Sequence, residues 1–437
     1  MTDPTPAAEA TASRGIARTA LLLLPLQAVF RGGEAVLPLL LAAWFGRGGD
    51  TDLYYLLAAY FVFASAFVTG AFQDSGVVPV LIEVAHTNPN RFPQVAGALL
   101  GHTLAIGCAV ALGTGSIAAA AFAFTSHARG LALLLVLLMS LGVVATAVRS
   151  FYVGLLNARS MFHAHPVCSG LGMGLTLGVL YFTRRALGVP AIPFAMLAGE
   201  VLNVTLLSTL TRRGLRLRMI PSLDRPEPVR RIMRLVRLEV FGSLITRINP
   251  VVDQLMAGIA GVIGGGTLLR YATDVASLPN SVLQATLFPV LLTRLAQEAP
   301  RPAQFIATTR KTLVAVVAIL SAASALLMVF RTPICSILFL HGAMDRAGVA
   351  RITQVLPWAL AGVAPFGALL VLARAHVARQ NSRIMPSMGA LNSALNAALN
   401  LLFVGSLGLS GIALSTSVTY LVVAIVFWVR LPRPGRA

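Results

Sequence analysis

The chain has 437 residues, of which 57% are hydrophobic and only 11% are charged. A soluble globular protein carries about 25% charged residues, so this chain has too few polar side chains to cover a water-exposed surface, and lipid must cover part of it. The formal net charge is +19. The arginines lie between apolar runs rather than on one polar domain, which argues against a nucleic-acid-binding protein and is typical of loops beside anionic lipid.

Apolar runs of the length needed to cross the hydrocarbon core, about 20 residues, recur along the chain. The first run continues past Arg31 and Glu34 to Phe45, so we interpret it as a membrane helix rather than a cleaved signal peptide. An all-α polytopic membrane protein of about twelve transmembrane helices is therefore predicted. The expected spans are residues 20–44, 53–73, 96–123, 131–149, 166–183, 190–210, 239–262, 268–292, 312–333, 352–373, 384–404 and 408–429.

The chain also repeats itself at about half its length. The motif Gly-x-Thr-x-Leu-x-Tyr begins at Gly49 and again at Gly265. Shorter matches follow at similar offsets, among them Pro79-Val80-Leu81 with Pro289-Val290-Leu291, and Ala158-Arg159 with Ala378-Arg379. Two parallel six-helix repeats around a central cavity are therefore expected, as in transporters that hold their substrate between two halves.

These repeats and the loop composition predict the domain boundaries. The predicted parts are a disordered N-terminus (1–13), an N-lobe with helices 1–6 (14–210), a basic cytoplasmic linker (211–238), a C-lobe with helices 7–12 (239–430) and a C-terminal tail (431–437). Within the linker, Arg230, Arg234 and Arg237 fall on one helical face and apolar residues on another. This pattern suits a helix on the membrane surface, and an ordinary basic connector is the alternative.

Basic residues are unevenly distributed between alternate loops. Most of the arginines, together with Lys311, lie on the side that holds both termini. Because cytoplasmic loops carry an excess of Lys and Arg, both termini are expected in the cytoplasm, in a multi-pass protein of a bacterial inner membrane.

Four stretches in chain order carry a resemblance to a known family. They are Phe45-Gly46 with Thr51-Asp52-Leu53-Tyr54-Tyr55, Leu287-Phe288-Pro289-Val290-Leu291, Leu338-Phe339-Leu340-His341-Gly342, and Ala378-Arg379-Gln380-Asn381 with Gly408-Leu409-Ser410-Gly411. They resemble the MurJ/MviN-type lipid II flippases of the multidrug, oligosaccharidyl-lipid and polysaccharide exporter superfamily. The resemblance implies flipping of a polyprenyl-diphosphate-linked glycan through an inward-facing cationic cavity. Leu37 stands where the family carries an arginine in the first span, and Asp274 or Val275 stands where it carries another in the eighth, which leaves the headgroup open.

Charged residues inside the predicted spans are the candidate substrate contacts, because a charge near the bilayer centre is usually paired or faces a cavity. Arginine suits a diphosphate, since its planar fork donates two parallel hydrogen bonds. The predicted substrate-binding residues are Arg31, Arg247, Glu34, Glu200 and Asp274. The alternative for Arg31 is a structural pair with Glu34 three residues later.

Two further sets of polar residues suggest a gate and an ion site. Asp52 and Asp74 lie near the ends of the second span and are candidate gate residues, with a solvated turn as the alternative for Asp52. The stripe Asn392, Asn396 and Asn400, together with Asp253, offers the oxygen ligands that Na⁺ would need, or a site for H⁺. Hydrogen bonding between helices is the alternative use of this stripe. No other cofactor is expected, and no Walker motif for ATP is present.

The leading functional hypothesis is a flippase, not an enzyme. Its substrate would be a lipid II-like peptidoglycan precursor or a polysaccharide repeat unit, moved from the cytoplasmic to the outer leaflet by ion- or potential-coupled alternating access. Membrane lipids and cell-envelope glycosyltransferases are the expected partners, and nucleic acid is not. The alternatives are a multidrug exporter of the same superfamily, a membrane enzyme that uses the same lipid carrier, and a non-transporting scaffold for cell-envelope synthesis.

Overall fold

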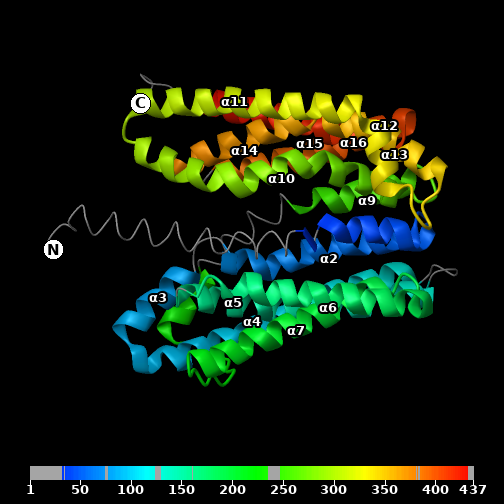
Figure 1. The fold of residues 1–437 in the computed structure, drawn as a ribbon. Helices are drawn as coiled ribbons and strands as arrows, with labels where there is room; N and C mark the ends of the chain where they lie inside the picture. Colours follow the sequence, from blue (N-terminus) through cyan, green and yellow to red (C-terminus); the bar gives the residue numbers. More distant parts are fainter. Residues whose placement is uncertain are drawn as a thin grey trace. The chain divides into compact units, whose positions relative to one another are not determined.

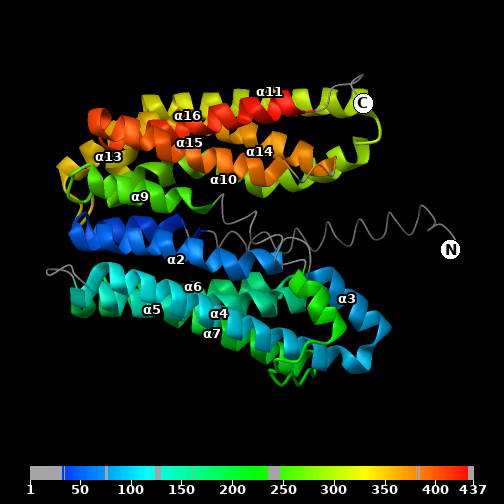
Figure 2. The same ribbon diagram turned by 180° about the vertical axis from the view of Figure 1, so that it is seen from behind.

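A computed structural model of the chain describes residues 32–33, 35–73, 77–123, 129–159, 161–234, 247–379, 381 and 384–431 (Figures 1 and 2). All regular structure in these residues is helical. A short apolar helix, Ala35–Phe45, comes first. The elements that follow are α2 (Gly49–Gln73), α3 (Val77–Thr87), η1 (Pro89–Arg91), α4 (Phe92–Ala123), α5 (Arg129–Ala158), α6 (Ala164–Leu187), α7 (Ala191–Thr209), η2 (Leu210–Gly214), α9 (Asn249–Ile259), α10 (Gly265–Glu298), α11 (Pro302–Val329), α12 (Arg331–Phe339), α13 (Arg346–Leu360), α14 (Val363–Ala378), α15 (Ile384–Leu407) and α16 (Leu409–Arg430).

Eight of the described helices are long and apolar enough to cross a membrane, and two bent pairs raise the number to ten. An all-helical polytopic membrane protein is thereby confirmed. The count of about twelve is not, because the first and seventh predicted spans fall partly outside the described residues. The short helices α3 and α12 are not among the predicted elements.

One predicted span, residues 352–373, is a bent pair of helices. α13 and α14 meet at an angle of 40°. At the bend, the Gly362 N–H donates to the Ala359 carbonyl (3.1 Å), so the Trp358 carbonyl loses its usual partner in the helix. The hydroxyl of Ser417 on α16 donates to that carbonyl instead, at 2.6 Å. A bend inside lipid is tolerated when a neighbouring side chain satisfies the released backbone group.

The chain divides into two compact units, which we describe separately. Unit 1 contains residues 1–40 and 64–239, and unit 2 contains residues 41–63 and 240–437. Residues 41–63 had been placed in the N-lobe but belong to unit 2. α2 therefore begins in one unit and ends in the other.

Unit 1 is built around the pairing of α6 with α7, which lie side by side in Figures 1 and 2. The two helices come into backbone contact at Gly172 and Gly199. A Cβ on Gly172 would meet the carbonyl oxygen of Gly199, and a Cβ on Gly199 would meet the carbonyl oxygen of Gly172 and the hydroxyl of Thr176. Small residues at such crossings let membrane helices approach closely, and here they place neighbouring polar side chains within hydrogen-bonding distance.

The described part of the predicted linker packs on unit 1. Residues 227–234 are helical. Val229 and Ile232 are fully buried in the hydrophobic cluster that also contains Phe92 and Phe151. Arg231 forms an exposed ion pair with Glu83 of α3, at 2.9 Å. The apolar face of this segment therefore packs against protein, while Arg237 lies outside the described residues.

Within unit 2, an ion pair and a backbone hydrogen bond join the chain just before α2 to the turn before α13. Arg47 donates from Nε and Nη2 to the two carboxylate oxygens of Asp345, each at 2.9 Å. The Ala343 N–H donates to the Ala43 carbonyl at 2.7 Å. Gly342, with a φ of +61°, faces the same carbonyl, and a Cβ at this position would collide with it. Only glycine combines this backbone conformation with such a close approach.

The Arg47–Asp345 pair predicts that the stability of the protein depends on pH. The Arg47 guanidinium and the Gly348 N–H lower the pKa of Asp345 from 3.8 to about 2. A depressed carboxylate pKa contributes stability that is present above about pH 4 and is lost as the pH falls toward 2. Asp345→Asn should therefore lower the unfolding temperature of the purified protein at pH 6, and this difference from wild type should shrink between pH 4 and pH 2. The effect should stay below about 1 kcal/mol because the pair is partly exposed. A difference that does not change with pH would contradict this.

Candidate functional site

The two copies of the repeated motif each begin a helix, and they contact each other in unit 2. α2 begins at Gly49 and α10 at Gly265. Oδ1 of Asp52 accepts hydrogen bonds from the backbone N–H and the hydroxyl of Thr267, both at 2.8 Å. The rings of Tyr55 and Tyr271 pack edge to face, with centroids 5.8 Å apart. Asp52 is therefore an anchor at the N-terminus of α10, where a carboxylate is stabilised by the helix dipole, rather than a residue of a solvated turn.

A second cluster in unit 2 surrounds Asp253 of α9. Oδ1 of Asp253 accepts hydrogen bonds from the side-chain amides of Asn396 (2.9 Å) and Asn400 (2.8 Å), both on α15. The hydroxyl of Thr416 on α16 lies 3.4 Å from Oδ2 of Asp253 and 3.3 Å from Oδ1 of Asn396. Three helices thus converge on one carboxylate. Among the described residues, only neutral groups donate hydrogen bonds to it.

This arrangement brings together three of the four predicted ion-site residues. Asn396 and Asn400 are fully buried. Asn392, one turn earlier on α15, makes no hydrogen bond to Asp253, and its buried Oδ1 has no partner among the described residues. The amide oxygen and nitrogen of an asparagine are assigned from the surrounding hydrogen bonds. A rotated amide would present oxygen instead, so the cluster can offer a cation carboxylate, amide and hydroxyl oxygens.

The two predicted substrate-binding residues that the structure describes in unit 2, Arg247 and Asp274, make no hydrogen bond to this cluster. Arg247 is exposed, just before α9. Asp274 pairs with Arg270 one turn earlier on α10, at 2.9 Å, and its buried Oδ2 has no partner in the described structure. Arg31 and Glu34, as well as the candidate gate residue Asp74, lie outside the described residues.

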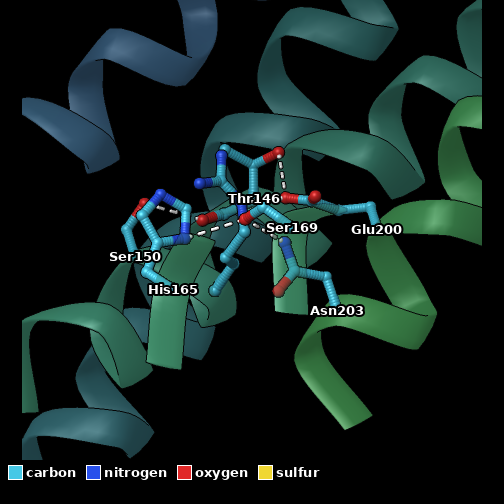
Figure 3. A network of polar contacts seen from close by, with 7 residues as sticks. Thr146, Ser150, His165, Ser169, Glu200 and Asn203 are labelled. Atoms are coloured by element: carbon cyan, nitrogen blue, oxygen red, sulfur yellow. Dashed lines mark hydrogen bonds and ion pairs between the residues drawn. The ribbon is translucent and has the colours of Figure 1, made fainter. Parts of the chain in front are cut away.

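Glu200, the remaining candidate, belongs to a polar network between α5, α6 and α7 of unit 1 (Figure 3). Oε1 of Glu200 accepts hydrogen bonds from Nε of Arg149 (2.5 Å) and from the hydroxyl of Thr146 (3.1 Å). Beside this pair, Asn203 donates to the hydroxyl of Ser169 at 3.0 Å. That hydroxyl lies 2.8 Å from Nδ1 of His165.

Comparison with known proteins assigns the chain to a family. Residues 41–436 match the family described as lipid II flippase MurJ. The chain belongs to the MurJ lipid II flippase family. No curated protein sequence matches it.

Solved structures of several transporters share the fold. A lipid II flippase MurJ in an inward closed conformation is 17% identical, with a TM-score of 0.78 over 94% of this chain and 87% of that one. An inward-facing multidrug resistance MATE family transporter is 14% identical, with a TM-score of 0.79 over 92% and 93%. A transporter from Pyrococcus furiosus with a binding pocket of reversed polarity is 13% identical, with a TM-score of 0.67 over 93% of each chain.

Two residues of these networks, Thr416 and Arg149, are not among the site residues predicted from the sequence of this MurJ family member. Thr416 stands in an apolar run beside Ser415, whose hydroxyl donates to the Asn400 side chain. A hydroxyl triplet at residues 415–417 was the available signal. The predicted span 131–149 ends at Arg149, whereas α5 continues to Ala158. The missed contact with Glu200 therefore lies inside a helix.

The Asp253 cluster predicts energetic coupling between α9 and α15. Asn396→Ala should lower stability by about 1.5–3 kcal/mol, because it removes a hydrogen bond to a buried charged group. In the Asp253→Asn background the same substitution should cost at least about 1 kcal/mol less. Reversible unfolding of the four proteins of this double-mutant cycle measures the coupling, and Asn392→Ala is the matched control on the same helix. Additive losses would show that Asp253 and Asn396 do not interact.

Proposed function

We propose that this chain flips a polyprenyl-diphosphate-linked glycan, a lipid II-like precursor or a polysaccharide repeat unit, from the cytoplasmic to the outer leaflet of a bacterial inner membrane. The match to the flippase family over residues 41–436 is the observation that carries this proposal. Both termini would lie in the cytoplasm, as the distribution of basic residues favours.

Asp253 would bind the coupling cation. A lone carboxylate within a membrane-spanning bundle is costly unless it is paired or serves an ion pathway, and the donors around Asp253 are all neutral. A cation that replaces these donors would be held by oxygens of α9, α15 and α16. Oxygen ligands suit Na⁺, and a proton on the carboxylate is the alternative coupling ion. Because one site joins three helices, occupancy of the site would favour one packing of these helices over another, as alternating access requires.

Asp52 would act as the gate residue, because two hydrogen bonds to Thr267 join α2 to α10 and must break if these helices separate. Arg31 and Arg247 would contact the diphosphate. Asp74 near the end of the second span would complete the gate. Cell-envelope glycosyltransferases would supply the substrate.

Multidrug export is the second candidate, since an inward-facing MATE family transporter shares the fold with a TM-score of 0.79. The two functions differ in the charge of the cargo. Competition of drug cations with lipid flipping would favour export of drugs, whereas inhibition by anionic lipid diphosphates would favour the flippase.

Reconstituted vesicles can test the proposal. The wild-type chain should expose a fluorescent polyprenyl-diphosphate glycan on the opposite leaflet, and an imposed Na⁺ gradient should accelerate it. Asp253→Asn should lower the gradient-driven rate at least about tenfold, because it removes the charged ligand of the cation. Asp224→Asn, at an exposed position in the linker, is the matched control and should transport normally.

Three outcomes are informative. No exposure of the glycan by the wild type would contradict the flippase. Rates that respond to pH but not to Na⁺ would assign the coupling to H⁺. Normal gradient-driven transport by Asp253→Asn would remove the proposed ion site and leave the flippase standing.

A further inference from the structure

Arg149 lies inside a membrane-spanning helix. α5 runs from Arg129 to Ala158 and is a candidate membrane span. At the centre of such a span a guanidinium costs about 3 kcal/mol on insertion scales unless it is paired or faces a polar space. Its presence there therefore needs a physical reason.

The ion pair with Glu200 uses only part of the guanidinium. Arg149 donates from Nε to one carboxylate oxygen of Glu200. Within the part of the chain that the structure describes, its two terminal nitrogens donate no hydrogen bond. Arg47 provides the contrast, because it engages both oxygens of Asp345 from Nε and Nη2. A structural arginine–carboxylate pair commonly takes this two-bond form. The two terminal nitrogens of Arg149 can therefore still donate hydrogen bonds to another acceptor.

The pair is also accessible, although its neighbours are buried. The side chains of Arg149 and Glu200 are 22% and 20% exposed. Ser169 and Asn203 beside them are each only 4% exposed. The buried Oδ1 of Asn203 has no partner among the described residues, so the polar network (Figure 3) is incomplete at a second point. Such a group is normally satisfied by water or by a hydroxyl.

We infer that Arg149 is an anion-binding residue that takes a phosphate of the lipid-linked diphosphate on its terminal nitrogens. Glu200 holds the guanidinium when no phosphate is bound and competes with the phosphate for it. Thr146 keeps the carboxylate in place through its hydrogen bond to Oε1. Guanidinium suits this role because carboxylate and phosphate both match its fork. The inference rests on the proposed function and adds a substrate contact in unit 1.

A purely structural pair predicts a different response. If Arg149 and Glu200 only tie α5 to α7, removing either charge destabilises the fold and leaves affinity for the lipid unchanged. If Glu200 competes with phosphate, neutralising the carboxylate must increase affinity. The sign of the Glu200→Gln effect therefore separates the two explanations, since glutamine keeps the size and one acceptor oxygen of glutamate.

The experiment measures binding of a radiolabelled polyprenyl diphosphate to the purified full-length chain, with the melting temperature recorded for each variant. Glu200→Gln should bind about fivefold more tightly, and Arg149→Lys about tenfold more weakly, because a point charge cannot replace the fork. Glu83→Gln, which removes the acid of the exposed pair with Arg231 in the same unit, is the matched control and should bind as wild type does. Inorganic pyrophosphate as competitor shows whether the phosphates alone are recognised.

Failure of this inference can be told from failure of the proposed function. Absence of lipid binding by the wild type would count against the flippase itself. Binding by the wild type that Glu200→Gln fails to tighten, or that Arg149→Lys fails to weaken, would overturn only the role of Arg149. Arg149→Lys keeps a cation beside Glu200, so it tests the contact even if larger changes at this position prevent folding.

Discussion

Lipid offers no hydrogen bonds, so every polar group inside the spans must find its partner in the protein or serve a ligand. This constraint explains features that otherwise have little in common. Ser417 satisfies the carbonyl released at the bend between α13 and α14. Asn396 and Asn400 donate to the carboxylate of Asp253. The helices are thus held in register by a small number of polar contacts, while apolar packing supplies most of the buried surface.

The two units satisfy their buried charges in different ways. In unit 2 the Asp253 carboxylate is surrounded by neutral donors, so the cluster keeps a net negative charge that a cation could neutralise. In unit 1 Arg149 and Glu200 neutralise each other. This neutral pair can bind an anion only if the anion replaces Glu200 as the partner of Arg149. The two proposed sites would therefore take ligands of opposite charge, as a transporter that moves an anionic lipid together with a cation requires.

The length of the apolar runs predicted most of the long helices, because such runs have few alternatives in a membrane protein. The four-residue spacing of the asparagines likewise fixed their common face, and the structure places Asn396 and Asn400 on Asp253. Arg149 could not be found in this way, since a hydropathy window ends a span at a charge and only packing shows that α5 continues. The assignment of residues 41–63 to unit 2 also depends on tertiary contacts, namely those of Asp52 and Tyr55.

The departures from the family pattern bear on which side chains could bind the diphosphate. The resemblance leads us to expect arginine at the positions where this chain has Leu37 and either Asp274 or Val275. The structure shows that Asp274 pairs with Arg270 on the same helix. A chain that keeps an anionic substrate after losing these arginines must supply cations from elsewhere. In the proposal made above, Arg149 would supply such a cation in unit 1 once phosphate displaces Glu200, because its terminal nitrogens donate no hydrogen bond within the described structure.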